Sequence, residues 1–491
     1  MRSWPVILKP SYWARHPWRA LGVLLALMLG VRLAWGWYAG HRLAAALDEI
    51  RRRGEPASLA DVVYPPLPDA QNAAAEHQRA AAALSTTVES PTNSNLDYFD
   101  YLPYPPKWTQ LAEASEKANT KAFAILRQSR PLTSAQYRRS LTSLWAANFT
   151  YINRVKELTN VVSDGAIYSH LQGDDTEALE RLFDVMHVAS SFRQDDLLIS
   201  QLVVIGIDSK TCTSVQLMAP GLRLDSRAST RPNTRQQVCR LIDQLLDEQG
   251  MGPQLRRAVV IERIAWLDFL NSRSSGNWAI KPLADMHAVR LLPDYDLTIQ
   301  ATQCTSHPEA LAILKRGRWE KPQATCDLFG ASRVHEIPRY SRWYDLITSN
   351  LTPYFERYFR NLGERRATAV VLACQLYRAD HGRWPNALAQ LMPEYLPAVP
   401  ADPFHADSRS IGYTVFKGEL PGGQDRPLVY FDAGQSDDVV IAGHPMYGWQ
   451  HDSRVGRGNT PTRQYRDLTR FPPTQSTKTV GNDPQKTNTP R

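Results

Sequence analysis

A carboxylate and an imidazole stand next to each other at Asp380 and His381, directly before Gly382. A carboxylate beside a histidine can take part in proton transfer, so this pair invites an acid–base interpretation. The residues before it, however, are apolar at helical spacing, and a glycine commonly follows the last residue of a helix. We therefore predict that these residues form a helix end and that His381 has a structural role.

Oxygen ligands suited to calcium gather between Phe431 and Asp438, where Asp432, Asp437 and Asp438 lie near Gly434. Calcium prefers carboxylate oxygens, and glycine permits a sharp turn between them. The spacing is not that of an EF-hand, and an acidic turn between two strands explains the same residues. Both interpretations stay open, and no other cofactor is predicted.

The remaining titratable residues are interpreted as structural or solvated. His187 falls on the apolar face of a predicted helix and is expected to be a core histidine. Charged neighbours in sequence point in different directions, and we expect solvation for three pairs: Asp174–Asp175, Asp195–Asp196 and Glu262–Arg263. No HExxH, GxSxG, Walker or GxGxxG motif is present. We expect a protein that is not an enzyme; an envelope hydrolase with an unrecognised site is an alternative.

The five cysteines do not have the spacing of a metal site. Cys374 falls on an apolar helical stripe and is expected in the core. Cys304 and Cys326 would form a disulfide bond in an oxidising compartment.

The net charge of +8 comes from the two ends of the chain. Residues 1–53 carry nine Lys/Arg and two Asp/Glu, and residues 451–491 carry eight and three. The part between them is slightly acidic and lacks the basic face that phosphate binding requires. We therefore expect no specific nucleic-acid partner.

The stretch from Ala20 to Tyr38 is apolar apart from Arg32. At 1.5 Å per residue it spans about 28 Å, close to the roughly 30 Å of a bilayer's hydrocarbon core. Arg32 lies near one end, where its side chain reaches the headgroups, and Trp35 and Trp37 belong to an interfacial aromatic belt. We predict a transmembrane helix over 20–38, with the lipid bilayer as partner. A cleaved signal peptide is the alternative, although no small-residue cleavage site follows.

Lys and Arg residues are nearly balanced on the two sides of this segment, but Arg15 and Arg19 lie closest to it. By the positive-inside rule, the N-terminus is then cytoplasmic. We expect a single-pass protein of the cytoplasmic membrane with its bulk on the outer, periplasmic side.

Helical periodicity dominates the middle of the chain. The predicted helices cover residues 41–53, 72–84, 109–128, 134–165, 175–193, 197–219, 235–249 and 254–269. They alternate with short breaks in the manner of αα-hairpins, without a regular 34-residue period. An irregular αα-hairpin array is therefore expected.

The last part of the chain is predicted to be a small α+β module. Its first helix has an apolar stripe from Ala367 to Tyr377, Gly382 ends it, and Pro385 prevents it from resuming. A short helix at 387–392 and antiparallel strands at 411–416, 428–431 and 439–441 follow.

The fold class is thus mainly α, with a transmembrane helix and a small C-terminal α+β module. Residues 273–350 are expected to be irregular, with one helix at 307–317. The predicted organisation is a basic N-terminal segment (1–19), a transmembrane helix (20–38), a juxtamembrane helix and Pro-rich connector (39–71), a helical array (72–272), an irregular elaboration (273–350), the α+β module (351–450) and a disordered basic tail (451–491).

Six residues of the α+β module match the pattern of a known family: Asp380, His381, Gly382, Pro385, Asp402 and Pro403. Over about 80 residues the module resembles the globular head of the major pseudopilins of type II secretion. The resemblance implies a sheet packed on a helix and an acidic loop that can hold calcium. The chain has no prepilin cleavage signature, and its apolar helix lies far upstream, so a borrowed head module is implied rather than a filament subunit.

The connector from Gly54 to Ala74 resembles the segment after the membrane helix in a group of uncharacterised bacterial envelope proteins. Together, these features predict a membrane-anchored structural or protein-interaction scaffold whose partners are other envelope proteins. An accessory role in a type II secretion or pilus-like apparatus is the alternative that the module favours.

Overall fold

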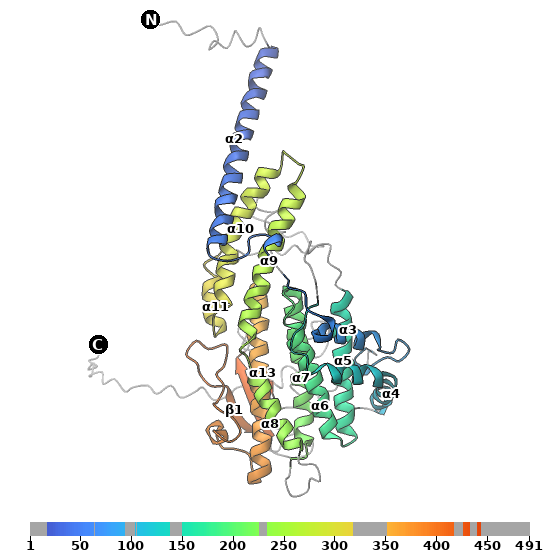
Figure 1. Cartoon of the computed structure of the whole chain (residues 1–491). Helices are drawn as coiled ribbons and strands as arrows, with labels where there is room; N and C mark the ends of the chain where they lie inside the picture. Colours follow the sequence, from blue (N-terminus) through green and yellow to red (C-terminus); the bar gives the residue numbers. More distant parts are fainter. Residues whose placement is uncertain are drawn as a thin grey trace, which may run out of the picture. The chain divides into compact units, whose positions relative to one another are not determined.

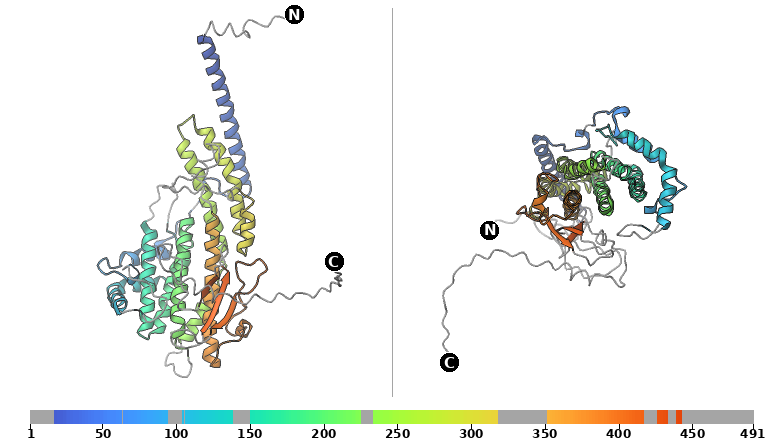
Figure 2. Two further views of the ribbon diagram at one scale, coloured as in Figure 1. Left: turned by 180° about the vertical axis from the view of Figure 1, so that it is seen from behind. Right: turned by 90° about the horizontal axis from the view of Figure 1, so that it is seen from below.

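The computed structural model describes residues 17–62, 64–93, 104, 106–137, 150–224, 233–317, 351–416, 426–432 and 439–442. The described chain is mainly helical, with a small antiparallel sheet near its C-terminal end, which confirms the predicted fold class (Figures 1 and 2). The α-helices are α2 (Pro17–Arg52), α3 (Ala73–Ala82), α4 (Pro106–Ser129), α5 (Thr150–Leu171), α6 (Asp175–Phe192), α7 (Leu198–Met218), α8 (Asn233–Leu246), α9 (Met251–Ser274), α10 (Lys281–Ala301), α11 (His307–Leu314) and α13 (Thr352–His381). The strands are β1 (Gly412–Phe416), β2 (Arg426–Asp432) and β3 (Val439–Ala442), and short 3₁₀ turns include η2 (Leu59–Asp61), η3 (Asp69–Gln71) and η7 (Leu388–Leu391).

Helix α2 is continuous from the predicted transmembrane segment through the predicted juxtamembrane helix. It is long and apolar enough to cross a membrane, and the apolar side chains of its first half are exposed. Ala39 and Ile50 are buried, and between them Leu43, Ala46 and Leu47 are half-buried on the face that packs against α9 and α10. The apolar half therefore extends past the neighbouring helices, whereas the second half is docked on them (Figure 1).

Ion pairs fix the end of α2 to the helices behind it. Glu55 pairs with Arg256 at 2.6 Å and with Arg263 at 2.9 Å, and Arg263 also donates to the carbonyl oxygen of Pro56 at 3.0 Å. Arg263 is completely buried, and Asp296 of α10 lies 3.5 Å from its guanidinium. We call Glu55, Arg256, Arg263 and Asp296 the α2 lock, because they join this helix to α9 and α10.

The helical array follows from amphipathic faces that pack on one another. Helices α5, α6 and α7 contact each other, and α8 and α13 continue the row beyond α6 and α7. On α6, the predicted apolar face is buried as expected; its members are Ala178, Leu179, Leu182, Val185, Met186 and Ala189.

Residues 134–137 differ from the prediction, because they are extended instead of helical. Ser134 forms a parallel bridge with Asn72, and its carbonyl oxygen accepts from the Ala73 N–H at 2.9 Å. The Asn72 side chain also accepts from the N–H of Gln136 and donates to its carbonyl oxygen. These partners satisfy the backbone without a helix, which helical periodicity alone does not reveal.

Residues 273–350 also differ from the prediction. The expected helix near 307 is present as α11, but α10 was not predicted. Pro293 lies inside α10, where a proline costs about 3 kcal/mol because it removes a hydrogen bond and crowds the preceding turn. Burial of Leu291, Leu292 and Tyr295 offsets that cost. Residues 318–350 lie outside the described part of the chain.

The C-terminal module is built on α13, whose predicted apolar stripe from Ala367 to Tyr377 is buried. The helix ends as predicted at Gly382, which has a φ of 69°. Strands β1, β2 and β3 follow each other in one antiparallel sheet. The sheet packs on α13 where the Phe431 ring lies against Gly363.

We expect Gly363→Ala to lower the free energy of unfolding by about 1 to 3 kcal/mol. A β-carbon at Gly363 would overlap the Phe431 ring, so the sheet would have to move away from α13. Thermal unfolding of the detergent-solubilised chain measures the loss. Gly206 in α7 is the matched control, since a β-carbon there meets no atom within 4 Å. Gly206→Ala is expected to stabilise the helix by up to about 1 kcal/mol, and equal effects of the two changes would contradict the prediction.

Candidate functional site

Asp380 and His381 are structural groups at the end of α13. Asp380 accepts from both terminal nitrogens of Arg235 in α8, at 2.8 and 2.5 Å, and from the Tyr395 hydroxyl at 2.7 Å. The hydrogen bond with Arg235 is the main cause of a lowered pKa at Asp380. His381 stacks on Tyr377, and its Nδ1 lies 3.0 Å from the Tyr377 carbonyl oxygen. Asp380 therefore fastens the helix end to α8, whereas His381 packs on its own helix.

The other residues of the matched pattern hold the chain that follows α13. The carbonyl oxygen of Pro385 accepts a hydroxyl hydrogen bond from β1 at 2.7 Å. The buried Asp402 accepts from the Phe404 N–H at 2.9 Å, and the carbonyl oxygen of Pro403 accepts from the His307 N–H at 2.8 Å. This segment thus ties the module to α11.

Two of the expected sites involve residues that the structure does not describe. Asp437 and Asp438 lie outside the described ranges, as does the side chain of Asp432, so the calcium loop stays a prediction. Within the described residues, no group of three or more His, Cys, Asp or Glu side chains is arranged to hold a metal ion. Cys326 also lies outside these ranges, so its disulfide with Cys304 stays a prediction.

Several charges that were expected in solvent are buried. Arg263 is completely buried, and Asp175, Asp195 and Asp196 are each at most 7% exposed. Arg263 has its partner in Glu55, which lies on a different element. The expectation of solvation is wrong for these four residues. Arg263, Asp195 and Asp196 have partners in segments that are distant in sequence. Asp175 pairs with His170, which lies five residues before it.

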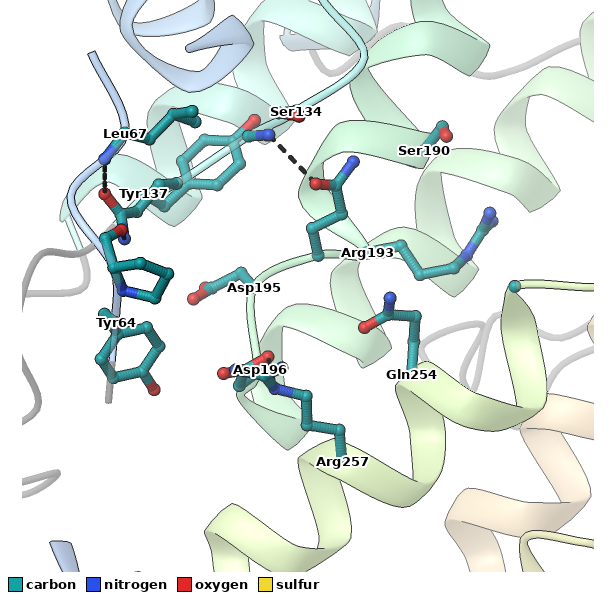
Figure 3. A pocket seen from close by; sticks show the side chains of 15 residues that line it. Tyr64, Leu67, Ser134, Tyr137, Ser190, Arg193, Asp195, Asp196, Gln254 and Arg257 are labelled. Carbon is teal, nitrogen blue, oxygen red and sulfur yellow. Dashed lines mark hydrogen bonds and ion pairs between the residues drawn. The ribbon is translucent and has the colours of Figure 1, made fainter. Parts of the chain in front are cut away.

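A polar cavity of about 520 Å³ lies where the connector after α2 meets the helical array (Figure 3). We call it the connector groove; its lining includes Tyr64, Leu67, Gln136, Ser190, Arg193, Asp195, Asp196, Gln254 and Arg257. These residues come from the connector, the segment after α4, the α6–α7 connection and the first turns of α9. Four separate stretches of chain therefore build it.

The walls of the connector groove are held by side-chain amides that each bind a backbone N–H and a backbone carbonyl. Gln136 accepts from the Leu67 N–H at 3.3 Å and donates to the Pro65 carbonyl oxygen at 3.1 Å. Gln194 accepts from the Ala135 N–H at 3.0 Å and donates to a carbonyl at 2.9 Å. This is how one strand of a sheet binds the next, so the amides hold the chain in an extended form.

Gln254 presents a third side-chain amide to the groove. Its side chain is half-buried and has no hydrogen-bond partner among the described residues. Figure 3 shows this amide pointing into the cavity between Arg193 and Arg257. It is therefore free to bind one further backbone amide.

Two buried carboxylates form the floor of the groove in front of α7. Asp195 accepts from the Tyr151 hydroxyl at 2.7 Å and from the Ser200 hydroxyl at 2.5 Å. Asp196 pairs with Arg257 at 2.7 Å, yet burial raises the pKa of Asp196. Both residues precede the N-terminus of α7, whose partial positive charge favours carboxylates.

Two neighbouring histidines, the buried His77 and the half-buried His187, lie behind the groove. His77 is completely buried, and its Nδ1 lies 2.8 Å from the Tyr137 hydroxyl. The rings of His77 and His187 meet edge to face, with centroids 5.2 Å apart. Burial lowers the pKa of His77 to about 3 and also lowers the pKa of His187, so both side chains are neutral at pH 7.

Acidification is expected to destabilise the folded chain through His77. In the unfolded chain a histidine binds a proton below a pH of about 6.5, whereas folded His77 stays neutral until its pKa of about 3. Since the unfolded state then binds more protons, the free energy of unfolding falls by about 1.4 kcal/mol per pH unit in this window. The loss is about 2 kcal/mol at pH 5. Thermal unfolding in detergent at pH 7 and pH 5 measures it.

His77→Gln is the control for this pH dependence. Glutamine does not titrate, so the variant should lose less stability than the wild type between pH 7 and pH 5. An unchanged difference between the two pH values would show that other groups cause the effect.

Most residues of the connector groove have no local signal in the sequence. Gln136, Gln194 and Gln254 are polar residues at unremarkable positions, and only the fold brings them together. Asp195 and Asp196 do have a signal, because two acidic residues directly before an apolar helix match its N-terminal dipole.

No protein-family model, curated protein or solved structure matches this chain. The function proposed below is therefore argued from the residues and contacts described above.

Proposed function

We propose that this protein is a non-enzymatic scaffold of the cell envelope that binds extended segments of other envelope proteins. In this proposal α2 spans the cytoplasmic membrane, the N-terminus is cytoplasmic and the helical body lies on the periplasmic side. The length and apolar character of α2 support the span, and the nearby Arg15 and Arg19 support the orientation.

The observation that carries the proposal is the set of side-chain amides around the connector groove. Gln136 and Gln194 already bind extended backbone through paired hydrogen bonds, and Gln254 offers the same group beside an empty volume. Main-chain hydrogen bonds give affinity for an extended polypeptide whatever its side chains are. The α2 lock supports a scaffold role, because it fixes the groove relative to the membrane helix.

The anchor is tested by fractionation. We expect the full chain to stay with the membranes after washing with alkaline carbonate, since a transmembrane helix is not released by loss of peripheral contacts. Recovery of the protein in the soluble fraction would contradict the proposal.

The groove is tested by photo-crosslinking of the full chain in its native membrane. p-Benzoylphenylalanine at Ser190, which lies exposed in the lining, should give covalent adducts with one or a few proteins. The same probe at Ala118, which is exposed on α4, should not give them. Gln254→Leu should weaken the Ser190 adducts several-fold, because leucine fills the same space without the amide. Adducts that persist unchanged in Gln254→Leu would contradict polypeptide binding through this residue.

An accessory role in a type II secretion or pilus-like apparatus is the second candidate. The packing of the β-sheet on α13, with Phe431 against Gly363, is the feature that favours it, since the pseudopilin-like pattern implies a sheet on a helix. Co-purification of a pseudopilin subunit with the full chain would support this role. Unchanged secretion and piliation in a deletion strain would count against it.

A further inference from the structure

The connection between α9 and α10 has an unusual surface for a loop in water. Two large apolar side chains of the connection are exposed, Trp278 at 57% and Ile280 at 42%, and so is Leu283 in the first turn of α10, at 37%. We call residues 275–283 the α9–α10 tip. Exposed tryptophan and aliphatic residues grouped on one short segment mark a contact with a partner or a membrane.

The α9–α10 tip lies against the part of α2 that is apolar enough to enter a bilayer. The guanidinium carbon of Arg32 lies 4.4 Å from the centre of the Trp278 ring. Pro282 packs on the next turn of α2, where a β-carbon at Gly36 would be 3.7 Å from Pro282 Cγ. Figure 1 and the left view of Figure 2 show this loop beside α2.

The depth of these contacts follows from the geometry of α2. Tyr38 marks the end of the apolar stretch, and Gly36 and Arg32 lie about 3 and 9 Å before it along the helix axis. Segments that lie in a membrane interface bury their apolar face by roughly 5 to 10 Å. The tip therefore reaches the depth at which Trp278 and Ile280 would meet the boundary between headgroups and acyl chains.

The contact with the α9–α10 tip lowers the cost of placing the charged Arg32 in an apolar span. A charged side chain inside an apolar span is costly, and the Nε of Arg32 is buried without a hydrogen-bond partner. The Trp278 ring covers one face of the guanidinium, which is a favourable cation–π contact where water is scarce. Lipid phosphates are strong acceptors for the remaining guanidinium N–H groups.

We infer that the α9–α10 tip inserts into the headgroup region of the same bilayer that α2 spans, where Trp278, Ile280 and Leu283 contact lipid. The inference rests on the proposed anchor. It adds a second membrane contact, which sets the depth of α2 and shields Arg32. Lys281 also lies in the tip, where its apolar stem would let its ammonium reach the headgroups.

The test is photo-crosslinking to lipid in proteoliposomes that contain the full chain and an alkyne-tagged phosphatidylglycerol. p-Benzoylphenylalanine replaces Ile280 in one variant and Ile199 in the matched control, because these isoleucines are 42% and 44% exposed. Ile199 lies far from the α9–α10 tip. It is three residues after Asp196, which pairs with Arg257 of α9. Arg257 lies about 25 Å along α9 from Ser274, the last residue before the tip. We expect at least about tenfold more tagged lipid on the chain with the probe at 280 than at 199.

A third variant with the probe at Leu25 in α2 separates this inference from the proposed anchor. Lipid adducts at Leu25 but not at Ile280 would overturn insertion of the tip and leave the anchor intact. Absence of adducts at both positions would overturn the anchor as well. Equal labelling at Ile280 and Ile199, or protein adducts in place of lipid at Ile280, would also overturn the inference.

Discussion

Replacing Glu55 with glutamine is expected to lower the free energy of unfolding by about 3 kcal/mol. Arg263 is completely buried, and Glu55 is its nearest carboxylate at 2.9 Å. Glutamine keeps the shape but removes the charge, so the guanidinium would stay buried with only Asp296 at 3.5 Å to balance it. Thermal unfolding of the detergent-solubilised chain measures the loss, and faster proteolysis after Arg52 would locate it at the end of α2.

Glu49→Gln is the matched control for the α2 lock. Glu49 also pairs with an arginine, at 2.6 Å from Arg52, but both side chains are more than half exposed. Exposed ion pairs contribute little, so this change should alter the free energy of unfolding by less than about 0.5 kcal/mol. Similar losses in both variants would mean that the lock does not fix α2.

Phe192→Ala is expected to be the most destabilising single change near the groove, at about 4 kcal/mol. Phe192 is completely buried, and its ring meets the rings of Tyr137 and Tyr151 at centroid distances of 4.8 and 6.0 Å. Removal of the ring leaves a cavity under the extended segment at 134–137. Chemical denaturation reports the stability loss, and proteolysis at this segment reports the loosened wall.

Phe192→Leu shows whether the cavity causes the stability loss of Phe192→Ala. Leucine fills most of the volume, so the loss should fall below about 1.5 kcal/mol, and the groove should keep its protection from proteases. An alanine variant as stable as the leucine variant would contradict a role for this ring as support of the groove.

The helical part of the fold was predictable because its signals are local. The apolar spacing on α6 and on α13 identified their buried faces, and Gly382 identified the end of α13. Helix α10 was missed, because Pro293 opposes a helix locally and only packing against α9 and α2 overcomes that preference. Tertiary contacts decided this element, and one sequence alone does not show them.

The connector groove was not predictable for a related reason. Its polar residues lie on segments far apart in the chain, and each of them is ordinary in its own segment. Arg263 illustrates the problem: beside Glu262 on a helix it has the pattern of a solvated charge, yet its partner Glu55 is 208 residues away. The acidic residues before α7 were visible, but their burial depends on Tyr151 and Arg257.

Helix α2 has no break between the half that can enter a bilayer and the half that is docked on α9 and α10. Its 36 residues form one rod of about 54 Å. A continuous helix of this kind is a rigid connection, whereas a flexible linker would let the two parts move independently. If the membrane thins or the helix tilts, the change in angle passes through Ala39 and Ile50 to the whole row of helices behind them. The groove would then move with the bilayer, so its height and direction above the lipid surface are set by the membrane itself.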